Sequence, residues 1–470
     1  MQGIAVLFLG SSSASRPDLE NSHAGSIASQ QNVLKRRVGS IENHQNALLY
    51  LPLPHGTQPI NMQPFWYRSL NKDARRSFWT VFCGFSVDSL DVQLYAFILP
   101  VLLAAWGLSH SEAGLLGAAT LTSSALGGWV AGMMADRFGR LRVLKLTILW
   151  FAISTCLCGL AADFDQLLIA RTLQGIGFGG ELAVGAVFIA EIAGPNVRSR
   201  MVGMAQSGWA VGWGLAAIIS AISLTLLPPE LGWRVTFILG VLPAIAIFIY
   251  RLKLKEPQAF MRSSRQFSWR AILSGPYLKS TILGSLLAAG MHSGYWAIAI
   301  WWPAMLEAEH GLATIESRLY LAVLVTGSFL GYVAGSWLGD IAGRKATLLM
   351  FALGGICIAL TYSNLSLYPT AMLLLSFPLG FVATGMFGVI GSVLTELFPT
   401  ELRASGLGFC YNFGRGIAGL APAVIGVTSE TMGITGAIAT YVVCAYILVM
   451  IVALLLPETR GVRLKNLSET

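Results

Sequence analysis

The chain has 470 residues, of which 55% are hydrophobic and 11% charged, and its formal net charge is +8. A soluble domain carries about a quarter of its residues as charged side chains, so this composition excludes an ordinary soluble protein. The excess of Lys and Arg is scattered over separate short segments rather than gathered in one patch, which argues against a nucleic-acid-binding protein.

The first 76 residues differ from the rest of the chain. They are rich in Ser, Asn and Gln, and their one apolar stretch, residues 4–10, is too short to span a bilayer and follows no basic region typical of a signal peptide. We expect residues 1–76 to be a disordered cytoplasmic tail. Alternatively, residues 1–61 are a mis-called start upstream of Met62.

Twelve apolar segments follow, and each is long enough to cross a bilayer as a helix of about 20 residues. They cover residues 77–105, 112–135, 143–162, 165–192, 200–227, 233–252, 275–305, 317–339, 346–364, 368–396, 403–428 and 434–456. The expected fold class is therefore an all-α integral membrane protein with twelve transmembrane helices.

Basic residues concentrate in every second turn between these segments. Arg137, Arg140 and Arg142 follow the second segment, and the turn after the sixth carries several more, counted from Arg251 to Arg270. Because Lys and Arg are retained in cytoplasmic loops, we expect a multi-pass protein of the plasma or inner membrane with both termini in the cytoplasm.

The six cysteines all fall inside predicted helices and show no CxxC spacing. We therefore expect no disulfide framework, no metal site and no cofactor. The sequence offers no recognisable pair of nucleophile and base, so an enzyme is not expected.

The segment 77–105 carries two acidic residues near the middle of the membrane. Asp88 and Asp91 are three residues apart and share one helical face with Tyr95. A charge at this depth costs about 2.5–3.5 kcal/mol on insertion scales, which indicates a functional role for both carboxyl groups.

The segment 165–192 carries a polar stripe. Arg171, Gln174, Phe178 and Glu181 lie at helical spacing and so share a face. We predict that Asp88 or Asp91 faces Arg171 in one state and carries a proton in another, with Glu181 as a spare carboxylate. A permanent Asp–Arg pair that joins the two helices without titrating is the alternative.

Candidate substrate contacts lie on the segments 275–305 and 403–428. A guanidinium group binds a carboxylate through two parallel hydrogen bonds, so Arg415 is the predicted anchor for an acid, with a structural ion pair as the alternative. His292 either contacts the substrate or relays a proton, or it is a packing histidine. The predicted contacts are Arg415, Asn412, His292, Tyr295, Trp296, Gln174 and Tyr95, and Trp209 and Trp213 could add an apolar wall.

The chain repeats itself at an offset of about 204 residues. Asp136 and Asp340 differ by 204 positions, and Glu191 and Glu396 differ by 205. Repeated signatures at one offset indicate two six-helix halves in parallel. The expected domains are 77–252 and 275–456, joined by a cytoplasmic linker, 253–274, and followed by a cytoplasmic tail, 457–470.

Two motifs carry a resemblance to a known family. The stretch GMMADRFGR at 132–140 resembles the signature of the major facilitator superfamily between its second and third helices, and RTLQGIGFGGE at 171–181 is similar to its fourth-helix signature. The resemblance covers residues 77–460. It implies two six-helix bundles that open alternately to either side of the membrane.

We expect the repeated charged residues to form a cytoplasmic gate that pairs across the two halves when that side is shut. The expected pairs include Glu191 with Arg198 and Glu396 with Arg403. A purely topological role for the same charges is the alternative. The predicted gating residues are Asp136, Arg137, Gly139, Arg140, Asp340, Arg344, Glu191, Arg198, Glu396 and Arg403.

Within the superfamily, Asp88-Ser-Leu-Asp91 resembles the Asp-Gly-x-Asp of aromatic-acid/proton symporters. The stretch WAVGWG at 209–214, together with the QSG before it at 206–208, is similar to sialic-acid and monocarboxylate symporters. The sequence thus predicts a proton-coupled importer of a small organic anion, such as a monocarboxylate, aromatic acid or acidic sugar, that works as a monomer. The alternatives are an uncoupled or proton-coupled transporter of a neutral sugar or metabolite, a drug exporter and, in a different class, a membrane substrate sensor.

Overall fold

A computed structural model describes residues 66–108, 110–257, 260–261, 269–310, 314–364 and 369–462. The described residues belong to one compact unit. The predicted tail, 1–76, lies mostly outside them, but its last residues are helical, since α2 spans Trp66–Ser69 and α3 begins at Lys72.

The first half of the described chain forms six membrane-length spans. They are α3 (Lys72–Trp106), α4 (His110–Phe138), α5 (Arg140–Leu160), α6 (Phe164–Ile192), the pair α7 (Arg198–Gln206) and α8 (Gly208–Leu226), and α9 (Pro229–Arg251). The helices α7 and α8 form one span interrupted at Ser207.

The second half follows two short 3-10 turns, η1 (Trp269–Leu273) and η2 (Gly275–Tyr277). Its helices are α11 (Leu278–His310), α12 (Thr314–Ile341), α13 (Arg344–Asn364), the pair α14 (Pro369–Gly385) and α15 (Phe387–Glu396), α16 (Arg403–Ala418) and α17 (Ala421–Leu455). Gly433 in α17 has a left-handed φ of 75°, which only glycine adopts without strain. It ends the span begun by α16 and starts the last one.

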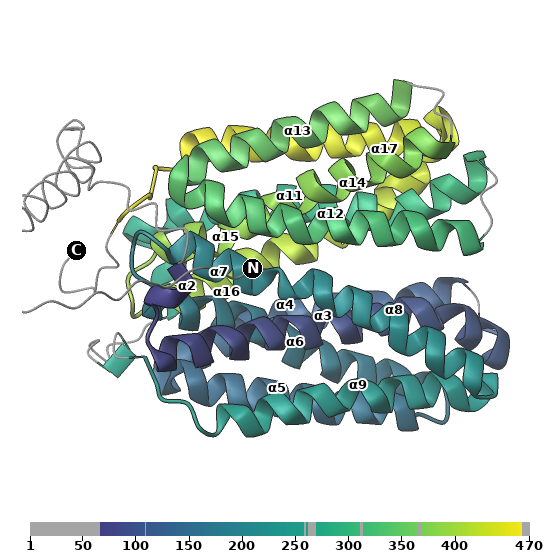
Figure 1. The fold of residues 1–470 in the computed structure, drawn as a ribbon, viewed down its shortest axis with the longest axis horizontal. Helices are drawn as coiled ribbons and strands as arrows, with labels where there is room; N and C mark the ends of the chain where they lie inside the picture. The colour runs from purple at the N-terminus through teal and green to yellow at the C-terminus, as the bar shows by residue number, and fades with distance from the viewer. Residues whose placement is uncertain are drawn as a thin grey trace, which may run out of the picture. The chain divides into compact units, whose positions relative to one another are not determined.

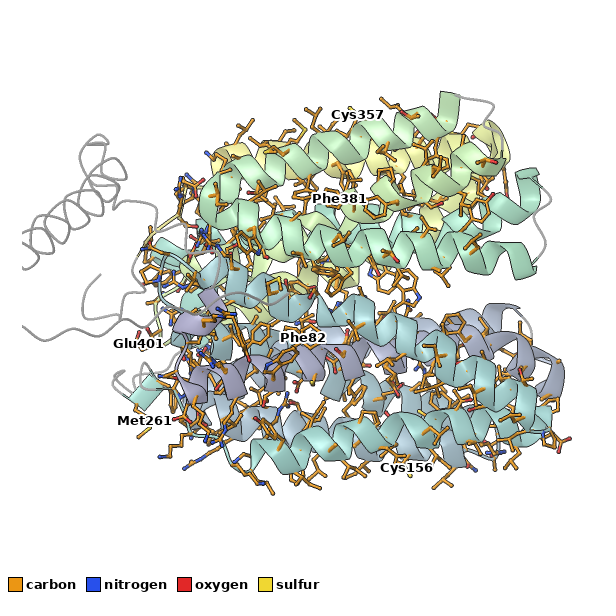
Figure 2. The ribbon with its side chains drawn as sticks, viewed as in Figure 1. Phe82, Cys156, Met261, Cys357, Phe381 and Glu401 are labelled. Atoms are coloured by element: carbon orange, nitrogen blue, oxygen red, sulfur yellow. The ribbon has the colours of Figure 1, made fainter. Side chains whose placement is uncertain are left out.

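Counted in this way, the described helices make the twelve predicted spans. Within the described residues, nine helices are long and apolar enough to cross a bilayer, judged by length and composition alone. Large apolar side chains on the outer surfaces, such as Leu226 and Leu374, are about 70% exposed or more (76% and 69%), as a lipid-facing surface requires. Figure 2 shows Cys156 and Cys357 on these outer faces.

The helices form two groups that lie along each other (Figure 1). In the first group α6 packs on α4 and α5, and α3 packs on α8; in the second α14 packs on α12, and α11 on α17. The two groups meet where α4 contacts α16 and where α7 contacts α12 and α15.

Glycines allow the close contact between α4 and α16. A Cβ atom added to Gly408 would lie 2.6 Å from the carbonyl oxygen of Gly128, and one added to Gly132 would collide with the backbone of Ala404. The two backbones therefore touch with no side chain between them, as is common in membrane helix packing.

Candidate functional site

The two aspartates of α3 are both buried, but their surroundings differ. Asp88 is fully buried, and neither of its carboxylate oxygens has a hydrogen-bond partner among the described residues. A buried carboxylate without partners is costly in its charged form, which singles out Asp88 as a group whose charge has to change or be compensated.

Asp91 is linked to Arg171 through an amide. The Nε2 atom of Gln174 donates to Oδ2 of Asp91 and, at 3.0 Å, to the hydroxyl of Thr155, while Arg171 Nη1 donates to Gln174 Oε1 at 2.7 Å. The guanidinium of Arg171 also lies 4.2 Å from the ring centroid of Tyr95. Four of the predicted residues thus form one cluster, which we call the Asp91 cluster (Asp91, Arg171, Gln174 and Tyr95).

The sequence predicts Glu181 as a spare carboxylate, and this prediction is wrong because Glu181 is paired. Both of its oxygens accept from Arg251, which also donates to the carbonyl of Leu144 at 2.7 Å. Arg251, assigned by sequence to a cytoplasmic turn, is fully buried at the end of α9. Gly84 makes room for this pair, because a Cβ there would collide with both charged groups.

A pocket lies between the two groups of helices, with an empty volume of about 410 Å³ that includes the open space at its mouth. Its lining is mostly aromatic and apolar, the composition typical of small-molecule sites. It is lined by Phe85, Leu182, Gln206, Trp209, His292, Tyr295, Trp296, Tyr332, Phe387, Tyr411 and Arg415.

Arg415 is the one strongly charged side chain of this lining. It is 3% exposed, and its guanidinium carbon lies 4.6 Å from the ring centroid of Phe178 and 5.1 Å from that of Tyr411. None of the ion pairs within the described residues includes Arg415, and its Nη1 atom has no hydrogen-bond partner there. The alternative role, a structural ion pair with an acid from another helix, is therefore not formed among the described residues.

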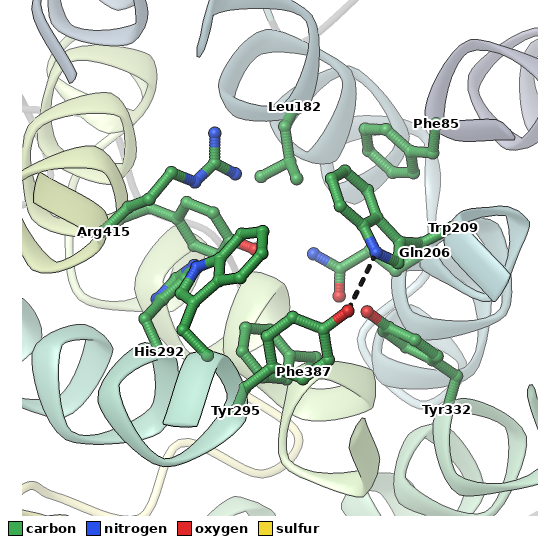
Figure 3. Close-up of a pocket in the computed structure, with 11 residues that line it drawn as sticks. Phe85, Leu182, Gln206, Trp209, His292, Tyr295, Tyr332, Phe387 and Arg415 are labelled. Atoms are coloured by element: carbon green, nitrogen blue, oxygen red, sulfur yellow. Dashed lines mark hydrogen bonds between the residues drawn. The ribbon is translucent and has the colours of Figure 1, made fainter. Parts of the chain in front are cut away.

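His292 and Tyr295 reach the same pocket from α11 (Figure 3). The Nδ1 atom of His292 lies 2.8 Å from the carbonyl oxygen of Ala288 and therefore carries the hydrogen, since a carbonyl only accepts. The hydroxyl of Tyr295 accepts from Trp209 Nε1 at 3.3 Å.

Three predicted substrate contacts lie elsewhere. Gln174 and Tyr95 belong to the Asp91 cluster. Asn412 is buried against Gly128 of α4 and donates to the carbonyl of Gly408 at 3.0 Å, so it belongs to the contact between α4 and α16. Trp209 lines the pocket as expected, whereas Trp213 is not part of the lining.

Several lining residues were not predicted: Phe85, Leu182, Gln206, Tyr332, Phe387 and Tyr411. Most are apolar or aromatic residues in apolar segments, where sequence alone cannot separate pocket from core. Gln206 did carry a signal in the sequence, because it is an uncharged polar residue within an apolar span.

Two aspartates cap helices of the opposite half. Asp136, at the end of α4, accepts from the backbone amides of Ala404 and Ser405 at 3.2 and 2.7 Å, at the start of α16. Asp340, at the end of α12, accepts from the amides of Ser199 and Arg200 at 3.2 and 3.0 Å, at the start of α7. A carboxylate is favourable at a helix N-terminus, so each contact holds the two halves together at this end.

Two glutamates join the halves as well, in a pairing other than the one expected. Glu191 pairs with Arg140 at 3.0 Å and, across the halves, with Arg403 at 3.0 Å. Glu396 pairs with Arg344 at 2.8 Å and, across the halves, with Arg198 at 2.8 Å. The expected pairs Glu191–Arg198 and Glu396–Arg403 are wrong, because each arginine reaches past its own half to the glutamate of the other.

The remaining gating residues lie at the same end. Gly139 has a left-handed φ of 112° at the start of α5, where the carboxylate of Glu256 accepts from the backbone amides of Leu141 and Arg142. Arg137 lies over the ring of Phe138, 5.2 Å from its centroid, and none of the ion pairs within the described residues joins it to the other half.

Comparison with known proteins agrees with this arrangement. The family model of the Major Facilitator Superfamily matches residues 81–419. A probable 4-methylmuconolactone transporter of Cupriavidus pinatubonensis is 38% identical over 408 residues, which are 86% of this chain and 95% of the relative. A cis,cis-muconate transport protein of Acinetobacter baylyi is 32% identical over 363 residues, 74% of this chain and 86% of the relative.

Among solved structures, the proton:xylose symporter XylE bound to 6-bromo-6-deoxy-D-glucose aligns with a TM-score of 0.72 at 18% identity, over 84% of this chain and 98% of that one. At this identity the likeness concerns the fold. Together with the matched family model and the sequence relatives, it shows that the chain belongs to the major facilitator superfamily and is a membrane transporter, not an enzyme.

Proposed function

We propose that this transporter imports a small organic anion together with protons. The observation that carries the proposal is Arg415, a buried cation without an ion-pair partner among the described residues, in a pocket between the two halves. A guanidinium in such a place attracts a carboxylate strongly, because the surrounding rings exclude water that would screen the charge.

The relatives support an acid as the substrate. Their names give 4-methylmuconolactone and cis,cis-muconate as transported compounds, both unsaturated organic acids of small size. The aromatic side chains around Arg415 offer faces on which a flat, unsaturated molecule can stack.

Proton coupling rests on the two aspartates of α3. Burial disfavours the charged form of a carboxyl group, so Asp88, which has no partner among the described residues, is placed to take up a proton during the cycle. Asp91 would exchange its contact with the Gln174–Arg171 pair for a proton. Each step would couple a charge change to helix movement.

The transport cycle we propose is a rocking of the two halves around the pocket. The pairs Arg198–Glu396 and Arg403–Glu191 and the caps formed by Asp136 and Asp340 close one end. With the basic turns on the cytoplasmic side, this is the closed cytoplasmic end, and breaking these contacts opens the transporter inward. The site lies within one chain, so a monomer suffices.

Uptake into proteoliposomes tests the proposal. We would compare carboxylates, neutral sugars and organic cations, each with and without an inward proton gradient. Uptake of carboxylates that the gradient stimulates is expected. Uptake of neutral sugars or cations alone would contradict the anion assignment, and carboxylate uptake that ignores the gradient would contradict the coupling.

A further inference from the structure

We propose that Gln206 selects the substrate, by binding one neutral hydrogen-bonding group at the far end of a monocarboxylic acid whose carboxylate is held by Arg415. This inference rests on the proposed function and deepens it. In this inference, Gln206 is a second point of substrate recognition besides Arg415, and substrates with a second charged group are excluded.

The first observation is an amide oxygen without a partner. Gln206 is 3% exposed, and its Oε1 atom has no hydrogen-bond partner among the described residues. Because buried polar groups are nearly always hydrogen-bonded, such an atom in the lining of a pocket indicates a contact that a ligand supplies.

The second observation is where this amide points. Gln206 is the last residue of α7, directly before the break in the span at Ser207. Figure 3 shows its amide and the hydroxyl groups of Tyr295 and Tyr332 turned toward the same part of the pocket, away from the guanidinium of Arg415. Because the Tyr295 oxygen accepts from Trp209, its own hydrogen is available to a ligand.

These groups form a neutral polar pole of the pocket, Gln206, Tyr295 and Tyr332. An amide and hydroxyl groups can both donate and accept, so a hydroxyl, a ring carbonyl or a ring nitrogen finds a partner there. A second carboxylate does not, because the neutral pole offers no cation and burying an unpaired charge is strongly unfavourable.

Recognition of this kind discriminates sharply. A site built to hydrogen-bond a substrate group rejects the analogue that lacks it by up to about 10⁴–10⁵-fold, since its own polar groups are then left unpaired. An apolar pocket discriminates far less between the same two molecules.

The test compares three probes with one ring and one shared carboxylate: benzoate, 4-hydroxybenzoate and terephthalate. Uptake of each into proteoliposomes is measured for the wild type, for Gln206→Leu and for Gln93→Leu. Gln93 is a buried glutamine of α3 outside the pocket lining, so its replacement controls for the loss of a buried amide.

We expect the wild type and Gln93→Leu to prefer 4-hydroxybenzoate over benzoate at least tenfold in kcat/KM and to exclude terephthalate. Gln206→Leu should lower this preference, the ratio of the two kcat/KM values, at least tenfold. Three results with these probes would overturn the inference: an unchanged preference in Gln206→Leu, no preference in the wild type, or efficient uptake of terephthalate. The inference would also be overturned if the wild type took up other carboxylates but none of the three probes. Failure of the proposed function is a different result, namely uptake of no carboxylate at all.

Discussion

At the scale of single residues, Asp88 and Asp91 show how two like side chains three positions apart can have different surroundings. Asp91 is held by Gln174, which also binds Arg171, whereas Asp88 has no hydrogen-bond partner among the described residues. In the proposed cycle, Asp88 is therefore the carboxyl group, of the two, that is more strongly favoured in its protonated form.

We expect Asp88→Asn to uncouple transport. The neutral amide mimics a permanently protonated carboxyl group, so exchange of labelled for unlabelled substrate should continue while gradient-driven accumulation falls at least tenfold. Both are measured in the same proteoliposomes. Accumulation by Asp88→Asn at the wild-type level would show that this carboxyl group does not carry the proton.

The buried pair Glu181–Arg251 leads to a prediction about stability. Removing one partner of a buried ion pair leaves an unpaired charge and costs about 3–5 kcal/mol. Glu181→Gln should therefore lower the thermal unfolding temperature clearly, and Glu181→Leu combined with Arg251→Leu should restore much of it. If Glu181→Gln unfolded at the wild-type temperature, the pair would not stabilise the fold.

Sequence patterns predicted part of this site because a charge in an apolar span is rare. Asp88 and Arg415 were identified from that cost alone, and both are buried. Arg251 was missed because a charge at the end of a span is common. It lies at the end of a span next to a basic turn, where topology explains a basic residue, and only the packing of α9 against α5 and α3 brings it to Glu181.

At the scale of helices, the proposed cycle requires the contact between α4 and α16 to close and open. Its two backbones meet at Gly128 and Gly408 with no space for a side chain. A larger residue at either position would hold α4 and α16 apart.

We expect Gly408→Leu to reduce transport at least tenfold and to leave the cytoplasmic end open, which labelling of cysteines introduced at that end would report. Gly214→Leu is the matched control, because a Cβ at Gly214 meets nothing within 4 Å. Equal transport by the two variants would mean that this close contact is not part of the cycle.

Helix lengths and number could be predicted from the apolar segments, but the interruptions could not. The breaks at Ser207 and Met386 lie inside predicted spans, without proline at either position. The position of Gln206 at the first break explains why a pocket residue was overlooked.

At the scale of the whole molecule, the repeat predicted which charged residues meet between the two halves but not how they pair. An offset of 204 places Asp136 and Asp340 at equivalent positions, and each indeed caps a helix of the opposite half. Each glutamate pairs with an arginine of the opposite half, Glu396 with Arg198 and Glu191 with Arg403. This pairing depends on how the two halves face each other.

Neutralising Asp136 tests whether these contacts work as a gate. Asp136→Asn keeps the size of the side chain but removes the charge at the start of α16. We expect a folded protein, judged by its gel-filtration profile, with substrate flux reduced at least tenfold. Normal flux in this variant would assign the contact a purely structural role.

The central claim is that Arg415 holds the carboxylate of the transported acid between the two halves. The most direct measurement is the dissociation constant of that acid and of its uncharged carboxamide, for the wild type and for Arg415→Lys, followed through the fluorescence of the pocket tryptophans. A lysine keeps the charge but loses the two parallel hydrogen bonds. We predict at least tenfold weaker binding of the acid to Arg415→Lys and little change for the carboxamide; equal affinity of the acid for both proteins would contradict the account.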